Sequence, residues 1–265
     1  MKEISNSDLY AKSLYRIGII QMMRLFDLNS AKSSFEGVRK NPRSGTLLIE
    51  SAFNIAEINL QQNYLEQSRI EYSKLLYFAP EYLMKSRFRL AELDYFETHF
   101  DSALSKLQKI TVETNQELTN DALELLYFIQ ENKGNSRPLL EEFARAELAL
   151  RQRKLTESLN HFKDLENKSK DAPLYDDVLM KIGEIQLKLG NSLDAITAFS
   201  FIADSLEQSI LRDRALMRIA EVYQFALREP VKATRAYEQL LARFPSSLHT
   251  SEARKRIRFL RGDAI

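Results

Sequence analysis

The stretch GEIQLKLGNSLDAITAFSFI, residues 183–202, contains the spacing that decides the fold. Two small residues, Gly183 and Ala195, stand 12 positions apart. Phe199 follows four positions after the second small residue, and Ile202 three positions after that. The spacing predicts two short helices that cross tightly where both residues are small, with the larger side chains filling the space beside the crossing.

The same pattern, with 12 or 13 positions between the small residues, recurs five more times. The other series are Gly18–Ala31–Phe35–Val38, Ala56–Ser68–Tyr72–Leu75, Ala91–Ala103–Leu107–Ile110, Ala146–Ser158–Phe162–Leu165 and Ala220–Ala233–Tyr237–Leu240. Apolar residues follow a helical period nearly throughout. All six prolines fall between the expected helices or at their starts, where proline is tolerated. The sequence therefore predicts an all-α array of helix pairs.

This pattern resembles the tetratricopeptide repeat (TPR), in which L-G-x2-Y is followed by A-x3-F and then by P. The resemblance covers about residues 7–262 apart from one inserted segment, and the family Tyr survives only as Tyr223. These departures are typical of a divergent bacterial type. The ending AYEQLLARFPSSLHTSEARKRIRFLRGD, residues 236–263, is similar to the last repeat and cap of periplasmic TPR proteins and outer-membrane assembly lipoproteins. The resemblance implies a TPR-like helical-hairpin solenoid that binds other proteins.

Successive series begin 38, 35, 55, 37 and 37 positions apart. The step of 55 leaves room for one extra helix, expected near 117–132, outside the two-helix alternation. A further helix at 248–261 is expected to cap the array, because an uncovered last repeat exposes its apolar face. The expected parts are an N-terminal lobe of three helix pairs at 1–115, an inserted helix and turn at 116–136, and a C-terminal lobe of three pairs plus the cap at 137–265.

The composition excludes several classes of protein. Lys and Arg number 38 against 37 Asp and Glu, so the net charge does not call for nucleic acid or a membrane surface. No apolar run is long enough for a membrane span. Cysteine is absent, which excludes disulfides. The start MKEISNSDLY is not typical of a signal peptide. We expect a cytoplasmic protein as the chain stands, and a periplasmic or outer-membrane-associated one if the chain is a fragment lacking its signal sequence.

No enzymatic motif is present, and the lack of Cys excludes thiol catalysis and cysteine zinc sites. His99, His161 and His249 lie far apart in the sequence and lack ligand spacing. The carboxylate pairs Asp94 with Glu97, and Glu141 with Glu142, are typical of solvated helix surfaces. We expect no catalytic residue, no metal site, no cofactor and no small-molecule substrate.

By the resemblance, the first helix of each pair lines a concave groove, and two positions of that helix point into it. The position three before the small residue is always large and apolar, and we name this set the apolar row: Tyr15, Phe53, Phe88, Phe143, Met180 and Met217. The position just after the small residue is acidic in five copies, and we name this set the acidic row: Glu57, Glu92, Glu147, Glu184 and Glu221.

Each row has two interpretations. The apolar row packs between neighbouring first helices as core, or it forms a partly exposed stripe that anchors a partner. The acidic row is neutralised by basic residues three positions earlier, namely Arg89, Lys181 and Arg218, or it contacts the partner. Both binding interpretations describe a groove that takes a helix or an extended segment of another protein.

A second candidate surface is the basic cap patch, which consists of Arg254, Lys255, Arg256, Arg258 and Arg261. Ala253, Ile257 and Leu260 form the opposite, packed face of the expected helix. The patch is a solvated basic helix end favoured by the helix dipole, or it contacts an acidic partner or an anionic surface. The sequence thus predicts a non-enzymatic scaffold that binds a protein partner. The alternative is a structural subunit of a cell-envelope or secretion assembly that uses its ends or its convex face.

Overall fold

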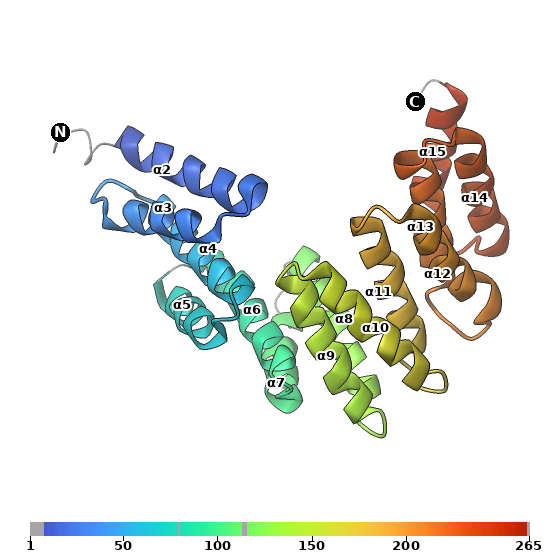
Figure 1. The fold of residues 1–265 in the computed structure, drawn as a ribbon, viewed down its shortest axis with the longest axis horizontal. Coiled ribbons are helices and arrows are strands. Elements are labelled where there is room, and N and C mark those ends of the chain that lie inside the picture. Colours follow the sequence, from blue (N-terminus) through green and yellow to red (C-terminus); the bar gives the residue numbers. More distant parts are fainter. Residues whose placement is uncertain (1–7, 79, 113–115, 264–265) are drawn as a thin grey trace. The chain divides into compact units, whose positions relative to one another are not determined.

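The computed structural model describes residues 8–78, 80–112 and 116–263, and in these ranges the chain forms helices joined by short turns, with no strand (Figure 1). No helix in these ranges is both long and apolar enough to cross a membrane. The chain divides into two compact units. Unit 1 is Met1–Gly134 with Arg151–Arg153, and unit 2 is Asn135–Leu150 with Lys154–Ile265.

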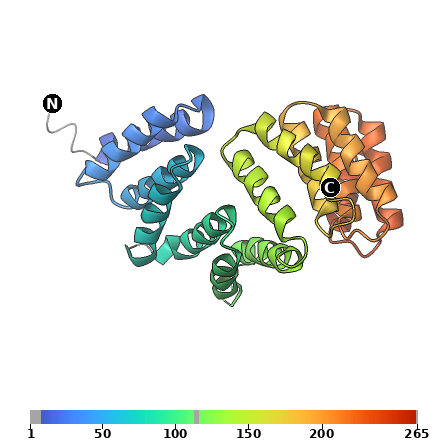
Figure 2. The same ribbon diagram turned by 60° about the horizontal axis from the view of Figure 1, so that its bottom comes forward.

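Unit 1 contains three helix pairs and one extra helix. Its elements are α2 (Asp8–Ile20), the π-helical turn η1 (Gln21–Leu25), α3 (Leu28–Lys40), α4 (Leu47–Gln61), α5 (Leu65–Phe78), the 3₁₀ turn η2 (Pro80–Tyr82), α6 (Leu83–Phe96), α7 (Phe100–Thr111) and α8 (Gln116–Asn132). Each helix packs against the next one along the chain (Figure 2). The extra helix α8 packs against α7 and α6, and it confirms the helix expected near 117–132.

Unit 2 begins with most of α9 (Arg137–Arg151) and ends with a capping helix. The elements after α9 are α10 (Leu155–Lys168), α11 (Tyr175–Lys188), α12 (Ser192–Ser205), α13 (Arg212–Glu221), the π-helical turn η3 (Val222–Ala226), α14 (Pro230–Arg243) and α15 (Thr250–Arg261). The cap α15 packs on α14, and its Ala253 and Ile257 join the core cluster that contains Tyr237 and Leu240. The expected solenoid of helix pairs with a cap is confirmed.

The helix crossings depend on the small residues of the pattern. Ala56, Ala91, Ala195 and Ala220 are completely buried. A Cβ atom added to Gly183 would lie 2.7 Å from Cζ of Phe199, whose ring is itself fully buried. In this crossing the aromatic ring therefore occupies the space that a larger side chain on the first helix would fill.

Two crossings use serine as the second small residue, and both serines are satisfied in the same way. The buried hydroxyl of Ser68 donates to the carbonyl oxygen of Ala56 at 2.9 Å. The hydroxyl of Ser158 donates to the carbonyl oxygen of Ala146 at 2.8 Å. Serine is tolerated in these dry contacts because its polar atom finds a backbone acceptor on the facing helix.

The π-helical turns explain why the pattern has two spacings. The small residues stand 13 positions apart in only two series, Gly18 to Ala31 and Ala220 to Ala233. The first helices of these two pairs end in η1 and η3. A π turn accommodates one additional residue within a helix. The extra residue is therefore absorbed before the turn, and the second helix keeps its register.

Each helix pair reverses direction through a residue in the left-handed conformation. These residues are Phe26, Asn63, Thr98, Arg153, Gly190 and Arg228, with φ between 56° and 85°. The amide that follows commonly closes the turn, as where His99 N–H donates to the carbonyl oxygen of Asp94 at 2.8 Å. Gly190 adopts this conformation without strain, and Asn63 is of a residue type that tolerates it well. Turn closure thus outweighs the local cost at the other four positions.

We predict that Gly183→Ala destabilises unit 2. The added methyl group meets the immobile ring of Phe199, and overpacking of this kind costs about 1–3 kcal/mol. That cost exceeds the gain of about 1 kcal/mol from the better helix propensity of alanine. Thermal unfolding followed by circular dichroism should show a lower midpoint. The control Gly134→Ala, which places its Cβ in open space, should leave the midpoint nearly unchanged. A Gly183→Ala midpoint at or above that of the wild type would contradict the proposed crossing.

We also predict that Thr98→Gly stabilises unit 1. The left-handed conformation costs a residue with a Cβ atom about 1–2 kcal/mol, and the entropy of glycine in the unfolded chain offsets part of the relief, which leaves a gain of about 0.5–1 kcal/mol. The matched change in the opposite direction, Gly190→Ala, should lower stability by about 1 kcal/mol. Urea denaturation measures both. If both substitutions raised the free energy of unfolding, or both lowered it, this explanation would be wrong.

Candidate functional site

The apolar row lies mostly in the core. Phe88, Phe143, Met180 and Met217 are only 2–8% exposed. Tyr15 and Phe53 are half-buried, and their rings pack on Phe35 and Tyr72 with centroids 5.7 Å and 5.4 Å apart. The idea of an exposed apolar stripe is therefore corrected for the four buried members, because neighbouring helices already cover them. The packing interpretation describes these four side chains.

In unit 1 the acidic row is part of a chain of ion pairs between first helices. Glu57 is buried on α4, and its carboxylate accepts hydrogen bonds from Tyr72 Oη at 2.6 Å and from Arg89 Nε at 2.7 Å. Arg89, on α6, also pairs with Glu92 on its own helix. Burial alone would lower the pKa of Arg89, but the carboxylates of Glu92 and Glu57 raise it. One guanidinium thus serves two members of the row.

Unit 2 repeats the arrangement. Glu147 on α9 pairs with Lys181 on α11, with oxygen and nitrogen 2.6 Å apart. Burial alone would lower the pKa of Lys181, but Glu147 and then Glu184 raise it to about 12. Arg218 pairs with Glu221 at 2.9 Å on α13. The acidic row is therefore largely neutralised by basic residues, both within one helix and between successive first helices. Its role in holding a partner stays a prediction.

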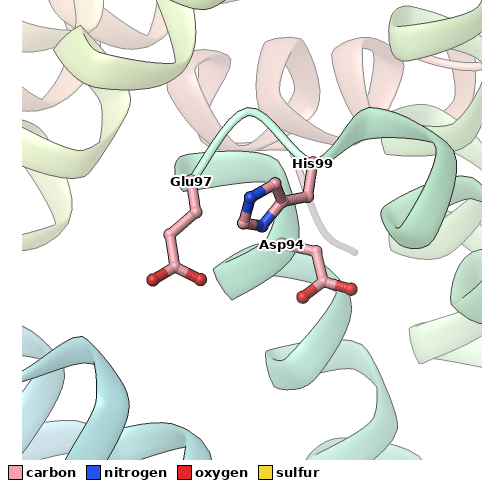
Figure 3. Close-up of side chains that lie close together, drawn as sticks. All are labelled: Asp94, Glu97 and His99. Atoms are coloured by element: carbon pink, nitrogen blue, oxygen red, sulfur yellow. The ribbon is translucent and has the colours of Figure 1, made fainter.

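A histidine and two carboxylates come together at the turn between α6 and α7. One ligand-type atom from each of Asp94, Glu97 and His99 lies within 4.8 Å of the others (Figure 3). The left-handed Thr98 reverses the chain directly after α6, which brings His99 back over Asp94. From the sequence, Asp94 and Glu97 are typical of a solvated surface pair, and His99 lacks ligand spacing. Their types are those that bind divalent metals in proteins.

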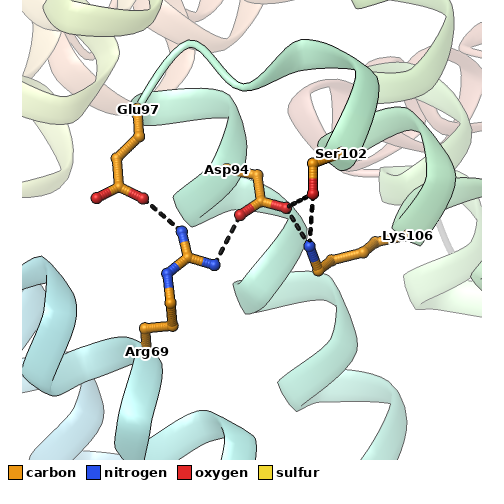
Figure 4. A network of polar contacts seen from close by, with 5 residues as sticks. All are labelled: Arg69, Asp94, Glu97, Ser102 and Lys106. Carbon is orange, nitrogen blue, oxygen red and sulfur yellow. Dashed lines mark hydrogen bonds and ion pairs between the residues drawn. The ribbon is translucent and has the colours of Figure 1, made fainter.

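Both carboxylates of this cluster are already engaged by cations. Arg69 on α5 donates to Asp94 Oδ1 at 2.7 Å and also pairs with Glu97 (Figure 4). Asp94 Oδ2 accepts from Ser102 Oγ at 2.6 Å and pairs with Lys106, both on α7. Two positive and two negative groups balance, so a divalent ion would have to displace Arg69 and Lys106. The geometry is that of an ion-pair network that ties three successive helices together.

The basic cap patch splits into two groups. Arg256 pairs with Glu252 at 2.6 Å and lies over the ring of Phe225, and Arg261 pairs with Glu238 at 2.6 Å. The other three, Arg254, Lys255 and Arg258, are exposed and line a hollow of about 250 Å³ together with Ser251. The predicted patch is therefore reduced to three solvent-facing cations on one side of α15.

The structure also exposes an apolar surface that sequence reasoning did not single out. We name it the N-terminal apolar face: Leu9, Ile17, Ile20, Met23 and Leu25, each 45–74% exposed. At 100° per residue, Leu9, Ile17 and Ile20 fall within about one quarter of the circumference of α2, opposite the buried Ala11 and Gly18. The available signal was that this helix carries apolar residues on both faces, which is typical of a helix covered on both sides.

We predict that Asp94→Asn lowers the free energy of unfolding at pH 7 by about 1–3 kcal/mol, because Lys106 and Arg69 lose a buried counter-charge while keeping some solvent contact. Burial alone would raise the pKa of Asp94, but Lys106, Ser102 and Arg69 lower it below its ordinary value of 3.8. Its charge therefore stabilises the fold above about pH 4, and this contribution is lost as the pH falls through the lowered pKa.

Urea denaturation at several pH values measures the effect. The difference between wild type and Asp94→Asn should be nearly constant from about pH 7 to pH 5 and should shrink below about pH 4. The control Asp101→Asn removes a carboxylate that is 86% exposed and paired with Lys133, and it should change little. A difference that grows as the pH falls would refute the assignment of Asp94 to the network.

Comparisons with known proteins agree with the repeat pattern. Residues 214–247, which span α13, η3 and α14, match the sequence model of the tetratricopeptide repeat family. No curated protein sequence gives a match. Among solved structures, the chain is similar to a tetratricopeptide repeat protein from Parabacteroides merdae at 14% identity and a TM-score of 0.39, with 95% of this chain and 98% of that one covered.

Two further solved structures show similarity at the same level. One is pilF of Pseudomonas aeruginosa, at 13% identity and a TM-score of 0.37, covering 92% of this chain and 96% of that one. The other is the TPR2AB domain of yeast Sti1 in complex with pHSP90, at 13% identity and a TM-score of 0.39, covering 96% of this chain and all of that one. The matched repeat at 214–247 has the same helix pair and buried small residues as the other five series, so residues 214–247 are similar to a tetratricopeptide repeat and the other five helix pairs repeat its pattern.

Proposed function

We propose that this protein is a non-enzymatic scaffold that binds a partner protein, and that the N-terminal apolar face is its main contact surface. Proteins of this repeat family generally act through protein contacts. The one cluster of histidine and carboxylates among the described residues is held by Arg69 and Lys106, which leaves its carboxylates engaged in ion pairs. Binding therefore accounts for the described surface better than chemistry does.

The exposure of the N-terminal apolar face carries the proposal. Leu9 is 74% exposed, Leu25 66%, and Ile20 and Met23 51% each. Covering such side chains is worth on the order of 1 kcal/mol or more apiece. Exposed apolar side chains gathered on one side of a helix, as Leu9, Ile17 and Ile20 are on α2, are typical of interaction sites on soluble proteins. We propose that a partner protein covers these exposed side chains of α2 and η1.

The observation favours contact through an end of the array over contact through the predicted groove. Phe88, Met180 and Met217 of the apolar row are buried. Glu57 of the acidic row has three internal partners, namely Tyr72, Arg89 and Arg151. A partner in the groove would have to compete with these contacts. The face on α2 and η1 requires no rearrangement. The proposal is therefore a scaffold that contacts its partner through the exposed side of α2 and not through the groove.

We predict that Ile20→Glu/Met23→Glu abolishes partner capture while the fold is retained. Both side chains face solvent, so charge there should leave the circular dichroism spectrum and thermal midpoint unchanged. The matched control is Leu193→Glu/Ile210→Glu, which places two charges at side chains of unit 2 that are 69% and 87% exposed. Tagged variants are expressed in the native host, crosslinked, and compared by quantitative mass spectrometry.

Proteins that crosslink to residues near α2 in the wild type and in the control should fall at least about tenfold in the Ile20→Glu/Met23→Glu sample, because a charge buried without a partner opposes association. Equal recovery from all three samples would place the partner elsewhere, with the predicted groove next to be tested. Light scattering on the purified protein identifies self-association: a wild-type dimer that the double variant converts to monomer would show that a second copy covers the face.

A further inference from the structure

The cations of α15 are divided by the fold into a bound set and a free set. Arg256 and Arg261 are held by Glu252 and Glu238. Arg254, Lys255 and Arg258 are exposed and have no ion pair among the described residues. Together with Ser251 these three occupy positions i, i+3, i+4 and i+7 of the helix, which lie on one side of it. We name these four residues the free basic face.

The free basic face is held on a fixed support. On the other side of α15, Ala253 is fully buried, Ile257 is 7% exposed, and Leu260 packs against the core of unit 2. Arg256 and its contacts with Glu252 and Phe225 further fix the helix. The three free cations therefore project from a docked helix, and they border a hollow of about 250 Å³. A preformed surface of this kind loses little entropy of its own backbone when a ligand binds.

Apolar side chains flank the free basic face. Leu248, in the turn that precedes α15, is 98% exposed and stands three positions before Ser251. Phe259 is 61% exposed and stands four positions after Lys255. Phe259 borders the same side of the helix as Lys255, because residues four positions apart in a helix are neighbours. The surface thus offers positive charge on one side of α15, with Phe259 beside it on the helix and Leu248 exposed in the turn that leads into the helix.

We propose that the free basic face binds an acidic segment of a partner protein, one in which two or three carboxylates lie beside an apolar residue. Charge complementarity selects the carboxylates. The length agrees, because seven residues of helix span about 10 Å, which matches about three residues of an extended peptide. The site is a second surface beyond the N-terminal apolar face and lies on a different helix, so either surface can fail in experiment without the other.

Two other anionic partners fit the geometry less well. Insertion into an anionic membrane needs a free apolar helix face, and on α15 that face is already packed in the core. Nucleic acid binding uses a stripe of cations that follows the phosphates, whereas here three cations occupy one short patch. An acidic peptide segment requires neither a free apolar helix face nor a long stripe of cations. Its apolar residue can also contact Leu248 or Phe259.

The test uses the full chain and a defined probe. The probe is a fluorescein-labelled peptide of about ten residues, long enough to extend past the face at both ends, composed of Asp and Glu with two Leu. Its matched control replaces every Asp and Glu by Asn and Gln. Fluorescence anisotropy measures binding to the wild type, to Arg254→Gln/Lys255→Gln/Arg258→Gln, and to Lys163→Gln/Lys170→Gln/Lys188→Gln. The last variant removes three exposed lysines from elsewhere in unit 2 and matches the change in net charge.

The wild type and the lysine variant should bind the acidic peptide with equal affinity, and the free-face variant about tenfold or more weakly, since three exposed ion pairs are lost. Added salt should weaken binding to the wild type more than to the free-face variant. Leu248→Ala/Phe259→Ala should weaken binding while leaving the salt dependence unchanged. Circular dichroism confirms that each variant is folded.

Three results would overturn the proposal. An equal loss of affinity in both triple variants would show that peptide binding depends on net charge alone. Equal affinity for the acidic and the amide peptide would remove the role of the carboxylates. Tighter binding to phosphatidylserine vesicles or to a single-stranded oligonucleotide, lost in the free-face variant, would assign the surface to a different class of partner.

Discussion

At the helix crossings an aromatic or leucine side chain from the second helix commonly lies beside a small residue of the first, and the rest of the structure depends on this contact. The rings of Phe35 and Phe199 occupy the space that a Cβ atom on Gly18 or Gly183 would need. Contacts of this kind are dry and closely packed, so a change of one methylene is felt. They set the distance between paired helices, and this distance determines which side chains of successive first helices can meet. The ion pairs between α4 and α6 and between α9 and α11 therefore follow from the crossings.

A comparison of magnitudes supports this order of dependence. A partly exposed ion pair contributes about 0.2–1 kcal/mol, whereas overpacking or emptying a buried contact changes stability by about 1–5 kcal/mol. The π-helical turns η1 and η3 support the same order of dependence. Where the turn segment contains one residue more, the helix takes up the extra residue as a π turn, and the small residues still meet. The chain accepts poorer backbone hydrogen-bond geometry at Gln21–Leu25 and Val222–Ala226 and keeps the crossing.

The fold could be predicted from the sequence because its determinants are local. The spacing from Gly183 to Ala195 and Phe199 lies within one helix pair, and the extra helix was visible as a gap in the repeat. Whether the apolar row is buried and whether the acidic row is paired could not be predicted in the same way. Glu57 and Arg89 stand 32 positions apart and meet only when successive pairs stack. The burial of Met180 depends likewise on its neighbours, because a large apolar residue on a first helix fits core and groove equally well.

The cluster at the α6–α7 turn shows a second limit of sequence reasoning. Nothing in the sequence around Thr98 indicates a residue in the left-handed conformation. Glycine is the left-handed residue in only one of the six turns. Without that conformation His99 would not be expected near Asp94. The same turn also explains why the cluster is structural. It places Asp94 at the end of α6, where Arg69 and Lys106 reach it from both neighbouring helices.

The polar network and the two proposed contact surfaces are complementary consequences of one repeat design. Charged side chains such as Glu57, Arg89 and Lys181 pair with the first helix of an adjacent repeat. By contrast, α2 exposes the apolar side chains Leu9, Ile17 and Ile20, and α15 exposes Arg254, Lys255 and Arg258, which have no ion pair among the described residues. The two helices therefore offer different chemistry to solvent. The two proposed contacts differ accordingly, since one would depend on apolar burial and the other on charge.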